Sequence, residues 1–224
     1  MQAPLCVYIL AGGQSRRFGR DKARAMIHGR ALLMRVKQMM GCVGQEVYCV
    51  GGQAQRYDDL GIETIADYEN PKVIDGIQAV GEDQHGGLGP LGGIAGGLAH
   101  HLKTRGKGWC WFVSCDLGVI KKHWLNELLA KIDTSALASD VKRGALAVAY
   151  RDAFWEPFPG LYHTDLLSDI GQNLIANKRS VQRLLKGVHT IAVDKPGDWP
   201  SCNQINTPED LKAFEDYLAA NESA

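Results

Sequence analysis

Short apolar runs alternate with amphipathic stretches along this chain, and this alternation restricts the possible folds more than any other feature. Six runs have the apolar character of strands buried inside a sheet: Leu5–Leu10, Val47–Val50, Glu63–Ala66, Trp109–Ser114, Ala145–Tyr150 and His189–Val193. Between them, apolar residues recur at helical spacing in 32–40, 91–102 and 124–132, and with breaks in 161–185. Thr207 and Pro208 then start a last helix. Such alternation predicts an α/β fold.

An α/β chain of this kind forms a mostly parallel sheet with helices on its faces, and its ligands bind at the carboxyl ends of the strands. The length of 224 residues suits one domain, and no repeat, low-complexity segment or linker divides it. We therefore predict a single domain over residues 1–224. The stretch from 67 to 89 is too long for an ordinary connection, which indicates a functional loop.

The first apolar run leads directly into a loop rich in glycine and in positive charge. Gly12 and Gly13 have no Cβ, so the backbone can turn sharply and bring N–H groups against a ligand. Four cations follow within seven residues: Arg16, Arg17, Arg20 and Lys22. Backbone N–H groups and clustered cations after a buried strand predict a cradle for a polyphosphate. The loop is not a P-loop, because Phe18 stands where that pattern requires glycine.

A single carboxylate follows the most apolar run. Asp116 comes just after Trp109–Ser114, so it would emerge at the carboxyl edge of the sheet. Mg²⁺ binds one or two carboxylates together with phosphate oxygens and water. We expect Asp116 to hold Mg²⁺ there; the alternative is that it caps a turn or a helix.

Several segments of the chain carry a resemblance to a known family. Leu10–Lys22 resembles the LAGGxSxRxGxDK signature of the molybdenum cofactor guanylyltransferases. Further segments are similar to this family in the expected order: Gly89–Gly93 (GPLGG), Val113–Asp116 (VSCD), Pro157–Tyr162 (PFPGLY) and Asn206–Leu211 (NTPEDL). The resemblance implies a three-layer αβα sandwich with a mostly parallel, Rossmann-like sheet of the nucleotide-diphospho-sugar transferase type.

The resemblance also implies an activity and a set of site residues. An enzyme of this family would transfer GMP from GTP to molybdopterin, releasing pyrophosphate, with Mg²⁺ as cofactor. The nucleotide would contact Leu10, Ala11, Gly12, Gly13, Lys22, Asp67 and Asp116. Catalysis would use Arg17, Lys22 and Asp116, with the metal on Asp116. The second substrate would meet Gly89, Pro90 and Asn206.

Two of the departures from the family pattern lie in the segments that match the predicted site. The family usually has proline two residues after the aspartate that matches Asp116, and this chain has Gly118. The family often has Asn or Asp two residues before the asparagine that matches Asn206, and this chain has Gln204. Because glutamine cannot supply a charged metal ligand, Asn206 is the better candidate for contact with a substrate or a metal-bound water.

Three alternative functions within the same fold stay open. They are transfer from CTP, transfer to a sugar phosphate or phospho-acid, and a non-catalytic GTP-binding module.

The balance of 25 basic against 25 acidic residues argues against binding nucleic acid or a membrane. The six cysteines show no paired spacing and predict buried, reduced thiols in a cytoplasmic protein. The resemblance implies transient contact with molybdenum-insertion proteins and apo-molybdoenzymes.

Overall fold

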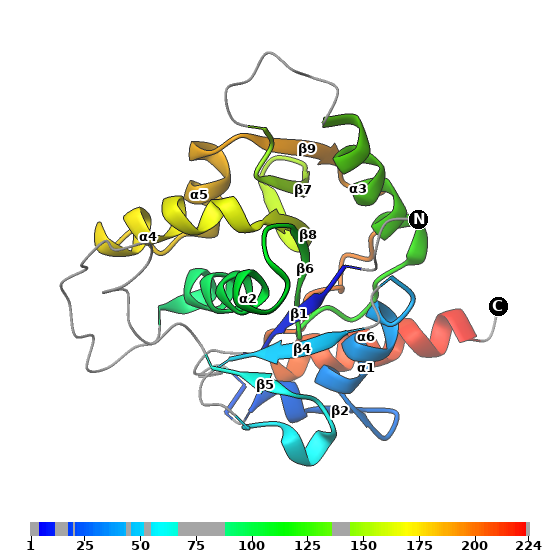
Figure 1. The fold of residues 1–224 in the computed structure, drawn as a ribbon. Coiled ribbons are helices and arrows are strands. Elements are labelled where there is room, and N and C mark those ends of the chain that lie inside the picture. The colour runs from blue at the N-terminus through cyan, green and yellow to red at the C-terminus, as the bar shows by residue number, and fades with distance from the viewer. Residues whose placement is uncertain are drawn as a thin grey trace.

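The computed structural model describes residues 5–11, 18–19, 21–43, 46–51, 55–66, 88–135 and 144–222. These residues form the α/β structure that the alternating pattern predicts, with helices around a central sheet (Figure 1). The sheet strands are β1 (Val7–Leu10), β4 (Val47–Val50), β5 (Thr64–Ile65), β6 (Trp109–Ser114), β7 (Ala147–Arg151), β8 (Trp155–His163) and β9 (Thr190–Asp194). The helices are α1 (Leu32–Met40), α2 (Gly89–Arg105), α3 (Lys122–Ser135), α4 (Leu167–Ile175), α5 (Val181–Gly187) and α6 (Pro208–Glu222).

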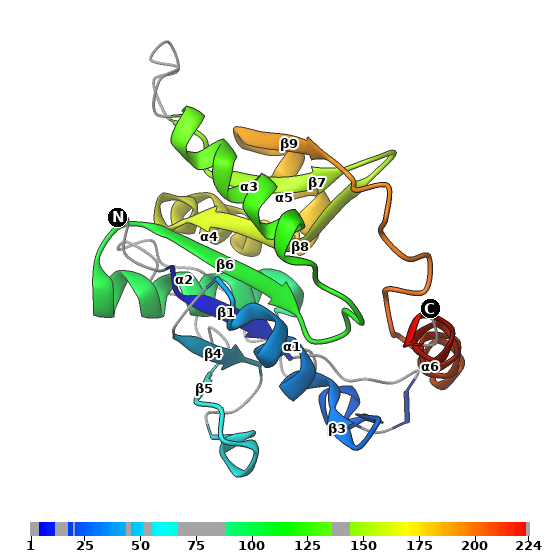
Figure 2. The ribbon, with the colours of Figure 1, turned by 90° about the vertical axis from the view of Figure 1, so that its right-hand side faces the viewer.

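The order of the strands in the sheet is β5-β4-β1-β6-β8-β7-β9. Strands β5, β4, β1 and β6 are parallel neighbours, and β9 is parallel to β7. Strand β8 runs antiparallel to both β6 and β7, so every other strand of this sheet points the same way. The segments that follow these strands therefore gather at one edge. Figure 2 shows the arrowheads of β4 and β6 pointing to the side on which α6 lies.

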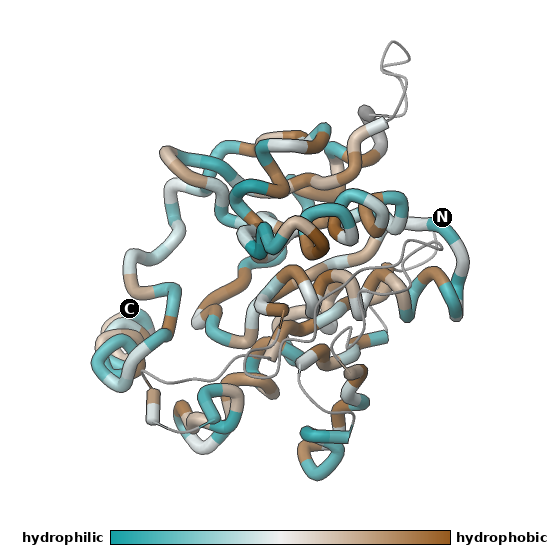
Figure 3. Tube along the Cα trace, turned by 90° about the vertical axis from the view of Figure 1, so that its left-hand side faces the viewer, coloured by the Kyte–Doolittle hydropathy of each residue, from teal (hydrophilic) through white to brown (hydrophobic). Residues whose placement is uncertain are grey.

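Helices cover both faces of the sheet and enclose two apolar cores. On one face, Ile94 of α2 packs in the core that contains Phe112, together with residues of α4 and α5. On the other face, Val36 of α1 and Leu125 of α3 pack in the core that contains Trp111. Hydrophobic and hydrophilic residues alternate along much of the covering helices (Figure 3), because these helices bury mainly one side. Helix α2 differs, because all of its residues from Leu91 to Leu98 are buried. The three layers agree with the predicted sandwich.

A third apolar core lies outside the sheet and holds α6 against the segment that contains the β2–β3 hairpin. A hairpin of β2 (Met26–Ile27) and β3 (Arg30–Ala31) stands apart from the main sheet. Ile27 and Leu32 pack with Phe18, Ile205 and Phe214. The predicted helix start is confirmed, because the Asp210 N–H donates to Thr207 Oγ1 over 3.1 Å. Helix α6 is thereby fixed near the carboxyl edge.

One predicted element is wrong. The region from 161 was expected to be helical, but residues 161–163 complete β8, and α4 begins only at Leu167. Prolines 157 and 159 argue against an inner strand, because proline donates no backbone hydrogen bond. The structure accommodates them in an irregularity: Tyr150 pairs with Glu156 and Ala149 with Gly160, so residues 157–159 have no partner in β7.

The cysteines follow the prediction with one clear exception. Cys6, Cys49, Cys110 and Cys115 are buried, Cys202 is partly buried, and no two of the six cysteines, all of which the structure describes, form a disulfide. Cys42 is exposed, because it lies in the turn after α1 rather than in a strand.

Among the described helices, none combines the length and the apolar character needed to cross a membrane.

Candidate active site

The end of β1 is held by the strands on both sides of it. The Ala11 N–H donates to the Val50 carbonyl over 2.8 Å, and the Cys115 N–H donates to the Leu10 carbonyl over 3.0 Å. Leu10 and Ala11 are both nearly buried, so their side chains belong to the cores. The chain thus enters the glycine-rich loop from a backbone that β4 and β6 fix in place.

Three predicted site residues meet at this edge of the sheet. Lys22 Nζ lies 2.8 Å from Asp116 Oδ2 and 3.1 Å from Asn206 Oδ1. The side chains of Lys22 and Asp116 are 17% and 18% exposed, so the pair is partly shielded but open to a ligand. Residues from three distant parts of the chain therefore form one polar cluster. Its two oxygen atoms converge on one cation, which is an arrangement of hard oxygen donors that would suit Mg²⁺.

The position of Asn206 is set by the segment before α6. The Ile205 N–H donates to the Asp116 carbonyl over 2.9 Å, and Leu117 forms an antiparallel bridge with Gln204. Asp210 Oδ2 accepts hydrogen bonds from the N–H groups of Asn206 and Thr207, both at 2.9 Å. These backbone hydrogen bonds are the main reason that the pKa of Asp210 lies below its ordinary value. The first turn of α6 therefore holds Asn206 against Lys22.

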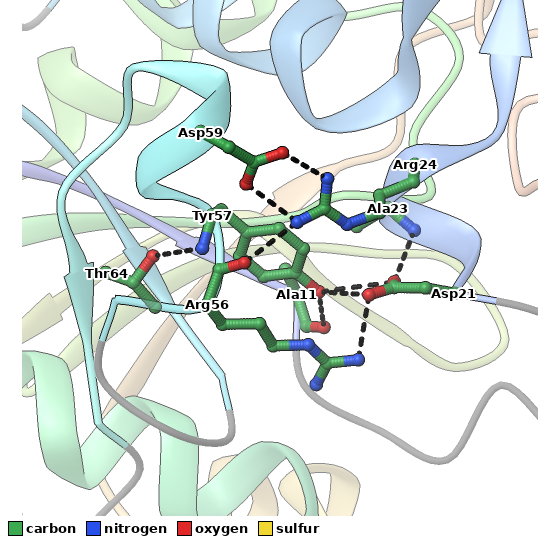
Figure 4. Close-up of polar contacts among 8 residues, drawn as sticks. All are labelled: Ala11, Asp21, Ala23, Arg24, Arg56, Tyr57, Asp59 and Thr64. Carbon is green, nitrogen blue, oxygen red and sulfur yellow. Dashed lines mark hydrogen bonds and ion pairs between the residues drawn. The ribbon is translucent and has the colours of Figure 1, made fainter.

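Asp21 anchors the residue that follows it, Lys22. Its carboxylate accepts hydrogen bonds from the Ala23 N–H at 3.1 Å, from the Tyr57 hydroxyl and from Arg56 Nη2 at 2.8 Å (Figure 4). The Ala23 contact caps the short 3₁₀ helix η1 (Lys22–Arg24). The aspartate of the Asp-Lys pair thus has a structural role, and the lysine is the residue of the pair that reaches Asp116 and Asn206.

The Tyr57 hydroxyl lies between the two ends of the glycine-rich loop. It is 3.2 Å from the Ala11 carbonyl, before the loop, and 3.1 Å from Asp21 Oδ2, after it (Figure 4). The ring of Tyr57 is fully buried, and burial raises the pKa of its hydroxyl, which stays protonated. Arg24 and Arg56 both lie over this ring, at 5.3 and 5.2 Å. The sequence offered no sign of this contact, because Tyr57 stands in a polar turn far from the loop.

A further carboxylate was not anticipated. Glu156, at the start of β8, pairs with Lys195 over 2.7 Å and accepts a longer hydrogen bond, of 3.4 Å, from Gln204 Nε2. Glu156 directly precedes the segment Pro157–Tyr162 singled out in the sequence, and this position was the only sign in the sequence that it could belong to the site.

Cys115 lies next to Asp116 in the chain. Burial raises the pKa of its thiol, so this thiol is protonated near neutral pH and is no nucleophile.

Comparison with known proteins agrees with this geometry. A sequence model of the MobA-like NTP transferase domain matches residues 7–193. The chain belongs to the MobA-like NTP transferase family. A probable molybdenum cofactor guanylyltransferase of Trichormus variabilis is 31% identical over 98% of this chain and 96% of that protein. The molybdenum cofactor guanylyltransferase of Ectopseudomonas mendocina is 30% identical over the same shares.

Solved structures show the same fold. The molybdopterin-guanine dinucleotide biosynthesis protein A of Archaeoglobus fulgidus superposes with a TM-score of 0.71 at 20% identity, over 96% of this chain and all of that one. A CMP-2-keto-3-deoxy-manno-octonic acid synthetase, solved with CTP, has a TM-score of 0.62 at 12% identity over 98% of this chain. The chain thus shares its fold with both of these proteins.

The other predicted residues of this MobA-like NTP transferase either lie elsewhere in the fold or fall outside the described residues. Gly89 and Pro90 are exposed at the first turn of α2, the helix that comes after β5 in the chain. Four predicted contacts lie outside the described residues: Gly12, Gly13, Arg17 and Asp67. Their roles stay predictions. No cluster of three or more His, Cys, Asp or Glu suited to a metal occurs in the described part of the chain.

The departure from the family pattern after Asp116 has a structural reason in this MobA-like protein. A Cβ on Gly118 would lie 2.4 Å from the ring of Phe214, which belongs to α6. The Gly118 N–H also donates to the Asn203 carbonyl over 2.9 Å, and proline could not make this bond. Glycine at this position therefore lets α6 pack closely beside Asp116.

Proposed function

We propose that this nucleotidyltransferase transfers GMP from GTP to molybdopterin and releases pyrophosphate. The observation that carries the proposal is the cluster of Lys22, Asp116 and Asn206, assembled in a chain that is similar over its whole length to named molybdenum cofactor guanylyltransferases. In the reaction, an anionic oxygen of the molybdopterin phosphate forms a bond to the α-phosphorus of GTP. The bond from that phosphorus to the β-phosphate oxygen breaks, and the electron pair leaves with pyrophosphate.

The nucleophile in this transfer is already deprotonated, so no strong general base is required. Catalysis then consists of positioning the phosphates and of offsetting negative charge in the transition state. Lys22 supplies a cation that Asp21, Asp116 and Asn206 hold at a fixed place. Gly12, Gly13 and Arg17 would add N–H donors and charge from the glycine-rich loop, and Asp67 would contact the nucleoside.

Asp116 and Asn206 present the oxygen atoms that would hold a Mg²⁺ ion together with the phosphates. When bound, the ion supplies positive charge to the phosphate oxygens. The fit rests on one carboxylate and one amide oxygen that converge on Lys22 Nζ. Gly89 and Pro90 would contact the second substrate from the start of α2.

Pyrophosphate release tests the proposal. The purified protein, with Mg²⁺ and molybdopterin, is expected to release pyrophosphate from GTP and not from CTP. Release from CTP alone would assign the protein to a cytidylyltransferase activity. GTP binding without release would assign a non-catalytic role, and release with a sugar phosphate in place of molybdopterin would assign another acceptor.

Three wider statements belong to the same proposal. The whole chain, residues 1–224, would act as one nucleotidyltransferase domain, which the alignment over 98% of its length supports. The enzyme would work in the cytoplasm, where free thiols persist. It would hand its product to molybdenum-insertion proteins or apo-molybdoenzymes through transient contacts.

A further inference from the structure

A second polar cluster lies at the carboxyl edge, formed by Glu156, Lys195 and Gln204. Lys195 Nζ is 2.7 Å from Glu156 Oε1, and the two side chains are 28% and 21% exposed. Gln204 Nε2 is 3.4 Å from Glu156 Oε2. The cluster joins the start of β8 to the segment between β9 and α6. Figure 2 shows this segment running along the edge from β9 to α6.

This second cluster borders the Lys22–Asp116 pair. Burial alternates along the segment before α6: Asn203 and Ile205 are buried, whereas Gln204 and Asn206 are exposed. Asn206 contacts Lys22, and Gln204 contacts Glu156. Since two residues of chain span at most about 7 Å, the two clusters are neighbours within reach of one ligand.

The order of the strands separates the two sides of the site. The glycine-rich loop follows β1, Asp116 follows β6, Glu156 begins β8 and Lys195 follows β9. In the sheet, β6 lies between β1 on one side and β8, β7 and β9 on the other. A nucleotide bound at the β1 loop, as in the proposed function, would have its α-phosphate near Asp116, and the Glu156 cluster would then lie beyond that phosphate, on the side of β8, β7 and β9.

The chemistry of this cluster suits an acceptor that carries a heterocycle. A carboxylate offers about four lone-pair sites, and Lys195 and the long bond from Gln204 use only part of them. The 2-amino-4-oxo edge of a pterin presents two adjacent N–H donors, which one carboxylate can accept together. Lys195 offsets the charge of the carboxylate, and the long bond from the exposed Gln204 side chain helps to hold Glu156 in place while leaving lone pairs accessible.

We infer that Glu156, held by Lys195 and Gln204, accepts hydrogen bonds from the N–H groups of the acceptor's pterin ring and so determines acceptor specificity. The inference rests on the proposed function for the identity of the acceptor. Guanine presents the same 2-amino-4-oxo edge, so the two substrates must be measured separately. The strand order assigns the pterin, and not the guanine, to Glu156.

The test measures the KM for molybdopterin and the KM for GTP in the full chain with Glu156→Gln. We expect the KM for molybdopterin to rise on the order of tenfold to a hundredfold, as for loss of hydrogen bonds to a charged group, with the KM for GTP unchanged. The matched control is Asp165→Asn. It removes the same charge from a Lys–carboxylate pair, with Lys107 at 2.9 Å, beyond the other end of β8. Both KM values are expected to stay as in the wild type.

Four outcomes would overturn the inference. They are an unchanged KM for molybdopterin in Glu156→Gln, a rise in the KM for GTP alone, an equal rise in both values, and a rise that Asp165→Asn reproduces. Wild-type turnover in these cases leaves the proposed function intact. Wild-type protein that releases no pyrophosphate contradicts the proposed function and this inference together. If Glu156→Gln does not fold, Gln204→Leu replaces it, because this exposed residue contacts Glu156 and leaves the Lys195 pair in place.

Discussion

The Lys22–Asp116 pair has to serve two purposes at the residue scale. In the free protein, each charge compensates the other inside a partly shielded cluster. In the proposed reaction, the phosphates of an entering nucleotide would compete with Asp116 for Lys22, and the carboxylate would become available to a metal. The pair therefore keeps both groups in place until the substrate arrives, which is a form of preorganisation.

Asp116→Ala is expected to abolish transfer and to leave the fold intact. Loss of one preorganised charge stabiliser lowers the rate on the order of 10²–10³-fold, and removing a metal ligand adds to this. Pyrophosphate release and the Tm measure the two effects. Near-normal turnover with Mg²⁺ present would contradict the metal assignment; a collapsed Tm would show that the pair is chiefly structural.

Tyr57→Phe is expected to weaken GTP binding indirectly, through the position of the glycine-rich loop. The hydroxyl lies within hydrogen-bond distance of both Ala11 and Asp21, on the two sides of the glycine-rich loop, so its loss removes one contact that holds the ends of that loop together. We expect the KM for GTP to rise about fivefold, in line with the loss of about 1 kcal/mol for one hydrogen bond.

Tyr150→Phe is the matched control for that change. Its hydroxyl is also buried, but it donates to the Trp124 carbonyl over 2.6 Å, between β7 and α3. Both variants should lower the Tm, and only Tyr57→Phe should raise the KM for GTP. Equal kinetic effects in the two variants would reduce Tyr57 to a purely structural role.

Among the contacts between elements, the packing of α6 against Gly118 is the one that fixes α6 beside Asp116. Gly118→Ala puts a methyl group where the Phe214 ring lies, and the ring must move. Overpacking of this kind destabilises proteins by about 1–3 kcal/mol. A lower Tm is expected, together with weaker activity, because Asn206 leads directly into α6.

Two further variants separate the clash from a general effect of replacing glycine. Gly144→Ala places its Cβ in open space and should leave the Tm unchanged. Adding Phe214→Leu to Gly118→Ala removes the obstructing ring edge and should restore part of the lost stability. A Tm that does not change in Gly118→Ala would show that α6 is not held at this contact.

The periodic elements were predictable, and the irregular one was not. Helices α1, α2 and α3 and strands β1, β4 and β6 follow from the pattern of apolar residues, because burial imposes it. Helix α6 follows from the capping residues at its start, Thr207 and Pro208. Strand β8 was not predicted, since its two prolines are untypical of an inner strand and its sequence lacks the usual strand pattern. Only its position between β6 and β7 makes it a strand.

For the whole molecule, the zero net charge is matched by local pairing of opposite charges. Lys22, Lys195, Arg24 and Arg56 approach the carboxyl edge, each in contact with a carboxylate. Such paired cations suit small anionic substrates better than a long polyanion, whose binding depends on many unpaired charges. This agrees with membership of a nucleotidyltransferase family.

A ligand that binds only the folded chain must raise its stability as a whole. GTP with Mg²⁺, at a hundred times its Kd, is expected to add about 2.7 kcal/mol to the free energy of unfolding. CTP at the same concentration is expected to leave the Tm unchanged. A shift with CTP and none with GTP, measured by thermal denaturation, would overturn the choice of base.

The sequence by itself determined the fold class, the glycine-rich loop and the importance of Lys22, Asp116 and Asn206. These properties depend on local patterns: apolar periodicity, glycine after a strand, and residues that end strands. Only the tertiary structure showed that Tyr57 joins the ends of the loop and that Glu156 meets Lys195 and Gln204. Contacts between residues far apart in the chain depend on strand order and on the paths of connecting segments, and no local pattern records these.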